Sequence, residues 1–347
     1  MNRAMPTATA LRLARPGAAA LLALLALAAV LAAACDGEDD GELREVTYMA
    51  GFRPQATLPF TAVYVADAKG YFADEGLAVT IQHSTQGEHL QLLLAGDVDF
   101  TTGTAAQLMR RRAAETPVRS VALFGQRGDQ GFVAHADSGI EAPADFAGRS
   151  VGFKAGVVPA ELLALLATAG LEADDVDLIG VPFDERVFIE GGVDVFPVFL
   201  SNEPNRIRNA GVEINVFDPT DYGVATLGLN IVTHERTIAD DRDLVQAFVR
   251  AAMRGAAYAA ANVEEAIEIV LTHAEGADAS HQRYLLETDL RNAQRADGMG
   301  RATLDQWEAL QAVLLEFDPA FEGPVDVSTV FDGSFVDAIY NDDGTLK

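Results

Sequence analysis

The stretch from Ala62 to Gln82 constrains the fold more than any other part of the chain, because it joins a helix to a buried strand through glycine turns. Apolar residues recur at helical spacing in its first half, and Gly70 then ends the helix. Residues 77–81, Leu-Ala-Val-Thr-Ile, have the pattern of a buried strand. The segment 88–100 repeats the order of helix, glycine turn and short strand. Repeated units of this kind predict an α/β fold built from successive crossovers.

The same residues carry a family resemblance. The sequence YVADAKGYFADEGLAV (64–79), followed by LLLAGDVDF (92–100), resembles the opening of type II solute-binding proteins of ABC importers. The similar branch takes up pyrimidine precursors of thiamine, sulfonates or nitrate. The resemblance covers about residues 45–275 and is strongest at 62–100 and 191–262. It implies an α/β, two-lobed periplasmic-binding-protein type II fold, in which each lobe is a mixed sheet flanked by helices and the ligand lies in the cleft between the lobes.

The amino terminus has the composition of an export signal. Three arginines, at positions 3, 12 and 15, precede the apolar run Ala18–Ala34, which ends at Cys35. At 17 residues the run is short for a membrane span, which needs about 20. Its order resembles a bacterial lipoprotein signal with Cys35 as the acylated first residue. Because Leu31 lies one position earlier than in the usual motif, an uncleaved anchor is the alternative.

Length and these segments together predict the domain organisation. A chain of 347 residues exceeds one ordinary core, which favours two lobes. We expect a signal peptide at 1–34 and a flexible polar tether at 35–44. We then expect lobe 1 at 45–128 and 228–347, and lobe 2 at 129–227.

Composition excludes several classes of function. The single cysteine leaves no disulfide within the chain and no cysteine-based zinc site. The formal charge is −27, and without residues 1–34 it is 22 basic against 52 acidic residues, or −30, which repels nucleic acid. The six histidines have no metal-ligand spacing, and there is no nucleophile elbow, P-loop or dinucleotide fingerprint. The absence of motifs does not exclude an enzyme, because catalytic groups can be scattered in the sequence. With the resemblance to solute-binding proteins, we expect no enzyme, no cofactor and no metal.

Candidate ligand residues come from the places where strands end, since open α/β sheets bind ligands beyond the carboxyl ends of their strands. Each has a purely structural alternative, such as core packing for the aromatic residues and helix capping for the hydroxyls. The predicted set is Phe52, Tyr64, Thr102, Phe124, Lys154, Phe196, Asn202, Glu203 and Tyr222.

Two motifs favour a planar heterocycle. In SNEP (201–204), Glu203 supplies a carboxylate that can accept the amino and ring N–H groups of an aminopyrimidine, although it also complements a helix dipole. A Glu-Pro and an acid-Tyr-Gly stretch recur in the similar branch, and INVFDPTDYG (214–223) matches the second, with Tyr222 as a stacking residue. A sulfonate or nitrate would need cationic loops, for which Lys154 and Arg127 are the candidates.

The resemblance implies a capture role at the cell surface. We expect the protein to bind an aminopyrimidine precursor of thiamine and to deliver it to an ABC permease with its ATPase. It would act as a monomer attached to the membrane through lipidated Cys35, in the periplasm or on the outer face of the cytoplasmic membrane. Riboflavin or a flavin precursor, and a sulfonate or nitrate, are the alternative ligands. A pyrimidine-synthesis enzyme is the alternative of another class, disfavoured because lipidation would consume the sole cysteine.

Further elements follow from local patterns. We expect a third strand at 98–100, a helix-opening loop at 101–104 and long helices at 243–262 and 263–271. Trp307 lies on an amphipathic helix at 305–317 and is expected in the core. Residues 326–340 are expected to form a closing helical segment.

Overall fold

The computed structural model describes residue 1, residues 42–154 and residues 156–347. The expected signal peptide (1–34), Cys35 and all but the last three residues of the expected tether (35–44) lie outside the described residues. Residues 43–347 form one compact unit. In the described part of the chain, no helix has the length and apolar character needed to cross a bilayer.

The first sheet has five strands in the order β2-β1-β3-β10-β4. Strand β1 is parallel to both of its neighbours, whereas β10 is antiparallel to β3 and β4. Three consecutive residues of β1, Tyr48 to Ala50, are buried, as expected for a sheet covered by helices on both faces. The strands are β1 (Arg44–Ala50), β2 (Leu77–His83), β3 (Phe100–Thr104), β4 (Val118–Leu123) and β10 (Leu229–His234).

The second sheet follows the same plan, in the order β7-β6-β8-β5-β9. Strand β6 is parallel to β7 and β8, and β5 is antiparallel to β8 and β9. In each sheet, therefore, the antiparallel strand in fourth place is the one that the chain enters when it crosses from the other sheet. The strands are β5 (Gln130–His135), β6 (Ser150–Phe153), β7 (Asp177–Gly180), β8 (Val195–Phe199) and β9 (Ile214–Phe217).

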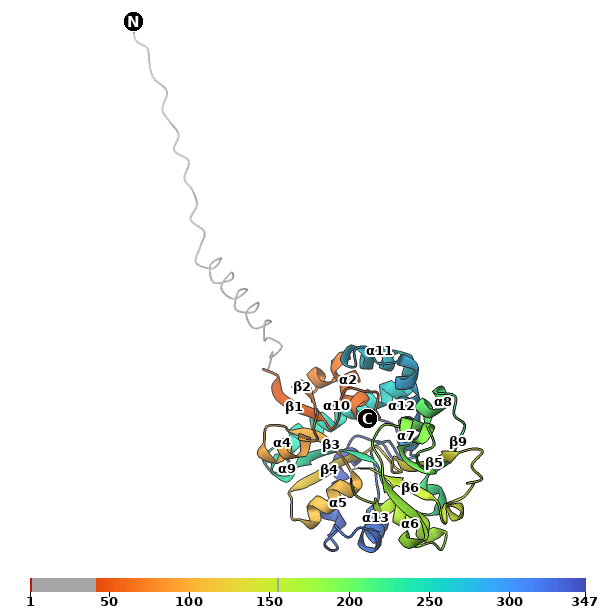
Figure 1. Ribbon diagram of the computed structural model, residues 1–347. Helices are drawn as coiled ribbons and strands as arrows, with labels where there is room; N and C mark the ends of the chain where they lie inside the picture. The colour runs from red at the N-terminus through yellow and green to blue at the C-terminus, as the bar shows by residue number, and fades with distance from the viewer. Residues whose placement is uncertain (2–41, 155) are drawn as a thin grey trace. The chain divides into compact units, whose positions relative to one another are not determined.

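Helices cover both faces of the first sheet (Figure 1). One face packs against α2 (Leu58–Ala68), α3 (Tyr71–Asp74), α10 (Arg242–Ala261), α11 (Val263–His273), α12 (Ala279–Asn292) and α14 (Ser334–Asp337). The other packs against α4 (His89–Ala95), α5 (Ala105–Ala113) and α13 (Leu304–Phe317), and α9 (Glu235–Asp240) follows β10.

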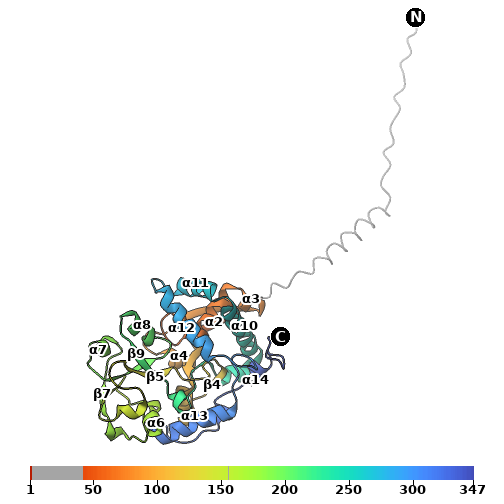
Figure 2. The same ribbon diagram turned by 90° about the vertical axis from the view of Figure 1, so that its right-hand side faces the viewer.

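The second sheet is covered by shorter elements (Figure 2). They are α6 (Ala160–Thr168), α7 (Arg186–Ile189), α8 (Glu203–Asn209) and the 3₁₀ turns Pro143–Phe146, Ala173–Asp175 and Pro219–Tyr222. Helix α13 contacts both α5 and α6, so the carboxyl-terminal region joins the two halves. Trp307 of α13 is fully buried, which confirms its expected core role.

Most expected elements are present, and the prediction of two mixed sheets flanked by helices is confirmed. The third strand is shifted, because residues 101–104, expected as a loop, continue β3 and pair with β10. The expected closing helix at 326–340 is reduced to the 3₁₀ turn Val327–Thr329 and the four residues of α14. Helix α12 was not predicted, since its buried face mixes Leu285 and Leu286 with polar Gln282 and Thr288.

Helix α10 packs closely against α2 at Gly255. A Cβ atom added at Gly255 of α10 would lie 2.0 Å from the carbonyl oxygen of Ala62 in α2, so only glycine allows this approach. The ring of Phe248, also in α10, stacks on Phe100 of β3 with 3.9 Å between centroids. The glycine thus sets the distance at which α10 can cover both α2 and the sheet.

We therefore expect Gly255→Ala to destabilise the protein, because two backbones must separate to admit one methyl group. The loss in the free energy of unfolding should be about 2 kcal/mol or more, as for overpacked cores, measured by urea denaturation. Gly323→Ala is the matched control, since an added Cβ there meets no atom within 4 Å. Equal stability of the two variants would contradict this packing role.

Candidate ligand-binding site

The structure brings four of the predicted residues together at the carboxyl ends of β6 and β8. The Nζ atom of Lys154, which follows β6, donates to Oε1 of Glu203 at 2.8 Å. Glu203 is 3% exposed, and its second oxygen accepts the N–H of Phe199 at 2.8 Å. The ring of Phe196 lies beneath the ammonium group, 4.8 Å from Nζ to the centroid. Asn202 immediately precedes Glu203 at the start of α8.

Local sequence explains why Glu203 is held there. Pro204 rigidifies the first turn of α8, and a carboxylate at this end complements the helix dipole. The residues before it form a tight turn that returns the chain from β8, so the side chain folds back onto the end of that strand. A buried carboxylate needs partners, and Lys154 and the Phe199 N–H supply them.

The first sheet contributes a second group. Phe52 follows β1 and is 50% exposed. The loop that carries it is fixed by Thr102, whose hydroxyl accepts the N–H of Gly51 at 3.0 Å. Thr102 itself is buried, so in this conformation it supports the Phe52 loop.

Three other predicted aromatic residues pack in or against the hydrophobic cores of the two sheets. Tyr64 is buried in α2, where its hydroxyl contacts Nε2 of His83 at 2.5 Å and its ring stacks on His273 at 4.1 Å. Burial raises the pKa of Tyr64. Phe124 is buried in the core of the first sheet, and Tyr222 packs half-buried against the core of the second.

Helix α12, missed in the sequence, links the two halves of the molecule. The two ring nitrogens of His281 each lie 2.9 Å from an amide oxygen, one of Asn202, which precedes α8, and one of Asn205, within α8. Tyr284, one turn further, donates its hydroxyl to the carbonyl of Leu200 at 3.1 Å. These contacts connect the helix that packs on α2 to the turn that carries Glu203.

Two acids in the same region also escaped prediction. Asp129, on the crossing from β4 to β5, accepts the N–H and the hydroxyl of Ser201 at 2.8 and 2.6 Å. Asp289 of α12 accepts the N–H of Leu58 at 2.8 Å. Burial, together with the neighbouring Asp289 carboxylate, raises the pKa of Asp129 to about 8, and burial raises that of Asp289 to about 7. The two carboxyls are neighbours in the structure but 160 positions apart in the sequence, so no local sequence pattern predicts that they lie together.

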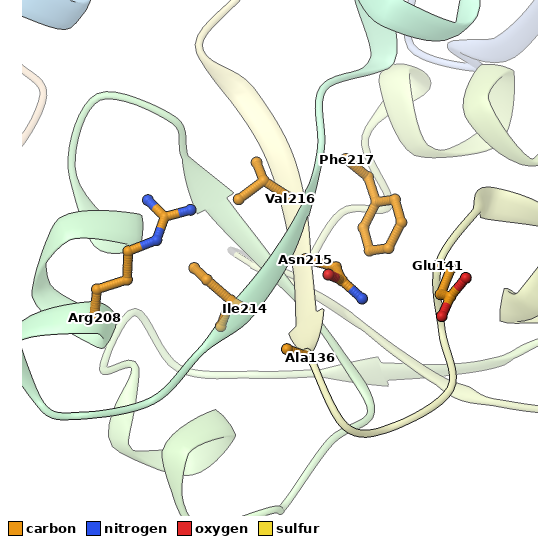
Figure 3. A pocket seen from close by; sticks show the side chains of 7 residues that line it. All are labelled: Ala136, Glu141, Arg208, Ile214, Asn215, Val216 and Phe217. Atoms are coloured by element: carbon orange, nitrogen blue, oxygen red, sulfur yellow. The ribbon is translucent and has the colours of Figure 1, made fainter.

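Two hollows in the surface lie elsewhere. The larger, of about 440 Å³, opens beside the edge strand β9, with Glu141 and Arg208 at its two sides (Figure 3). The other, of about 380 Å³, lies beside the start of β1 and β2, next to α3. Neither hollow contains a predicted ligand residue, and neither lies at the carboxyl ends of the parallel strands.

The raised pKa values of the two acids give a pH prediction. Both carboxyls stay protonated in the folded protein at pH values where unfolded aspartate, with a pKa near 4, is ionised. Their contribution to stability is fully present below about pH 4 and is lost as the pH rises through about 7 to 8. Between pH 5 and 8 the free energy of unfolding should therefore fall by about 2 to 3 kcal/mol more in the wild type than in Asp289→Asn.

Urea denaturation at several pH values measures this difference, with Asp137→Asn, at an exposed position, as the control. Parallel pH profiles for the wild type and Asp289→Asn would contradict the assignment.

Comparisons with known proteins agree with this architecture. The NMT1/THI5-like family model matches residues 58–266. The riboflavin-binding protein RibY of Chloroflexus aurantiacus is 30% identical over 308 residues, covering 85% of this chain and 86% of RibY. The formylaminopyrimidine-binding protein of Halalkalibacterium halodurans is 29% identical over 262 residues, covering 73% and 79%.

Among solved structures, the periplasmic aliphatic sulphonate binding protein SsuA of Escherichia coli superposes with a TM-score of 0.64 at 15% identity, covering 80% of this chain and 87% of that one. At this identity the likeness shows the fold, which is the two-lobed one of periplasmic binding proteins. The family model matches more than half of this chain. The chain therefore belongs to the NMT1/THI5-like family and is a solute-binding protein of the ABC-import type.

Proposed function

We propose that the protein captures a small planar nitrogen heterocycle, an aminopyrimidine precursor of thiamine, and delivers it to a membrane permease driven by a separate ATPase. The observation that carries this proposal is the Glu203 carboxylate, buried at the carboxyl end of β8 among aromatic rings. A buried carboxylate recognises a ligand that brings N–H donors, and an aminopyrimidine offers an amino group beside a ring nitrogen that can carry a proton.

The charge of the surroundings supports a neutral or cationic ligand over an anion. Glu203 is a buried acid, and Lys154 is already paired with it. Asp129 and Asp289 are held protonated by their raised pKa values and bring no positive charge. A sulfonate or nitrate would require free cations or several bare N–H groups. Arg127, the second candidate cation, is paired with Asp218 and Asp221.

Flat apolar surface supports a planar ligand. Phe52 after β1 and Phe199 at the end of β8 are large apolar side chains with half or nearly half of their surface open to solvent. Both positions are carboxyl ends of parallel strands, where α/β sheets bind ligands. Aromatic rings at such positions stack on planar heterocycles at little conformational cost.

Delivery follows from closure of the two lobes. A ligand that contacts both lobes shifts the open–closed equilibrium toward the closed form, which the permease would recognise. The contacts of His281 and Tyr284 with the turn before α8 and with the start of this helix are of the kind that closure forms. The expected acylation at Cys35 would hold the protein outside the cytoplasm as a lipid-anchored monomer.

A flavin is the second candidate ligand, because the riboflavin-binding relative matches 85% of this chain. Its three-ring system would use the same aromatic surface and would also bring an imide N–H to a carboxylate. An enzymatic role of the pyrimidine-synthesis type is disfavoured, since Cys35 is the sole cysteine and acylation would consume it.

Calorimetric titration with aminomethyl- and formylaminomethyl-pyrimidines, thiamine, riboflavin, taurine and nitrate tests the proposal. We expect an aminopyrimidine to bind and Glu203→Gln to weaken it by about 1.5 to 3 kcal/mol, the scale of a charge-assisted hydrogen bond. Glu190→Gln, at an exposed position of the same lobe, is the control and should leave the affinity unchanged.

Each other outcome has a distinct meaning. Binding of riboflavin alone would retain the transport role and replace the ligand. Heat from taurine or nitrate alone would overturn the role of Glu203 in recognition.

A further inference from the structure

The ammonium group of Lys154 lies inside a cage of aromatic rings. The Nζ atom is 4.8 Å from the ring centroid of Phe196 and 5.5 Å from those of Phe183 and Phe199. Glu203 closes the cage with a carboxylate oxygen at 2.8 Å. The side chain of Lys154 is only 10% exposed, so its charge has lost most of its water.

The cage has the composition of a receptor for an organic cation. Ring faces within about 6 Å attract a cation more strongly when it is desolvated, and a buried carboxylate supplies the full counter-charge. A structural ion pair needs no exposed rings around it. Yet Phe183 is 60% and Phe199 40% exposed, so two walls of the cage keep free faces.

The cage also stands where a ligand would arrive. Lys154 follows β6, Phe183 follows β7, and Phe199 ends β8. These three strands are parallel neighbours in the second sheet, and their carboxyl ends form one edge. Phe183 was not among the residues predicted from sequence, because a single exposed phenylalanine after a short strand carries no pattern.

We propose that this cage binds the cationic or amino end of the ligand and that the Lys154 ammonium is a built-in competitor, which occupies the cage until the ligand displaces it. The proposal rests on the proposed function and adds the class of ligand group, a protonated or amino-substituted nitrogen. Lysine suits this role because its charge is compact and its four-carbon stem is flexible. Exchange of one cation for another leaves Glu203 paired throughout, which avoids an uncompensated buried charge.

A competitor and a direct ligand contact make opposite predictions for Lys154→Met, which keeps the apolar stem and removes the charge. If Lys154 competes, the variant should bind 4-amino-5-aminomethyl-2-methylpyrimidine about ten-fold more tightly than the wild type, a change of about 1.4 kcal/mol. Lys69→Met is the matched control, because Lys69 also pairs with a glutamate, Glu265, and lies 4.4 Å from the ring of Tyr258. It should leave the affinity unchanged.

Chemical labelling of lysine gives an independent readout. The sequence has three lysines, at 69, 154 and 347, so acetylation at each can be followed by mass spectrometry. We expect the pyrimidine to increase acetylation of Lys154 and to leave Lys69 unchanged. Weaker binding by Lys154→Met, or protection of Lys154 by the ligand, would overturn the proposal.

A further titration distinguishes failure of the proposed function from failure of the cage proposal. If the wild type binds riboflavin and no aminopyrimidine, Lys154→Met is titrated with tetramethylammonium and benzamidinium. Binding of either cation, lost again in Phe183→Leu, would support the cage without the pyrimidine. The absence of binding to both would overturn the cage.

Discussion

Two chain crossings organise the whole structure, because each delivers the antiparallel strand that completes a sheet. The chain leaves β4 of the first sheet and enters β5, which pairs with β8 and β9 of the second. It returns from β9 to β10, which lies between β3 and β4. The first crossing carries Asp129, whose bonds to Ser201 fasten the crossing to the turn before Glu203. The crossing from β4 to β5 is therefore hydrogen-bonded to the turn that carries Glu203 in the candidate site.

The candidate site is governed by the cost of burying charge. Three carboxyl groups lie in this region, and each is satisfied in a different way. Glu203 is paired with a lysine, while Asp129 and Asp289 accept hydrogen bonds from protein groups and have raised pKa values. A ligand that supplies N–H donors or positive charge can take over this role. An anion would add to the cost, which supports the proposal of a nitrogen heterocycle as the ligand.

The sequence allowed much of the architecture to be predicted, because helices with uniform apolar patterns are locally determined. The expected helices at 243–262 and 305–317 match α10 and α13 within one residue. Helix α12 and the strand character of residues 101–104 depended on tertiary partners, namely α2 and β10. The two sheets share one strand order although the sequences of their strands differ. Backbone hydrogen bonds pair the strands, and these do not require similar side chains.

For the candidate site, the types of residue were easier to predict from the sequence than the directions of their side chains. Glu203 and Lys154 were expected near a ligand, and they lie together at a strand edge. Tyr64 and Phe124 have aromatic rings that could contact a ligand, but both side chains are buried in the core. The direction of a side chain depends on its exact position along the helix or strand, which the sequence does not fix near a turn. A crystal structure of the protein with 4-amino-5-aminomethyl-2-methylpyrimidine tests the central claim most directly. We predict the ring against Phe199, with an N–H group within hydrogen-bond distance of Glu203 and Lys154 withdrawn. A ligand in the hollow beside β9, with the Lys154–Glu203 pair intact, would contradict it.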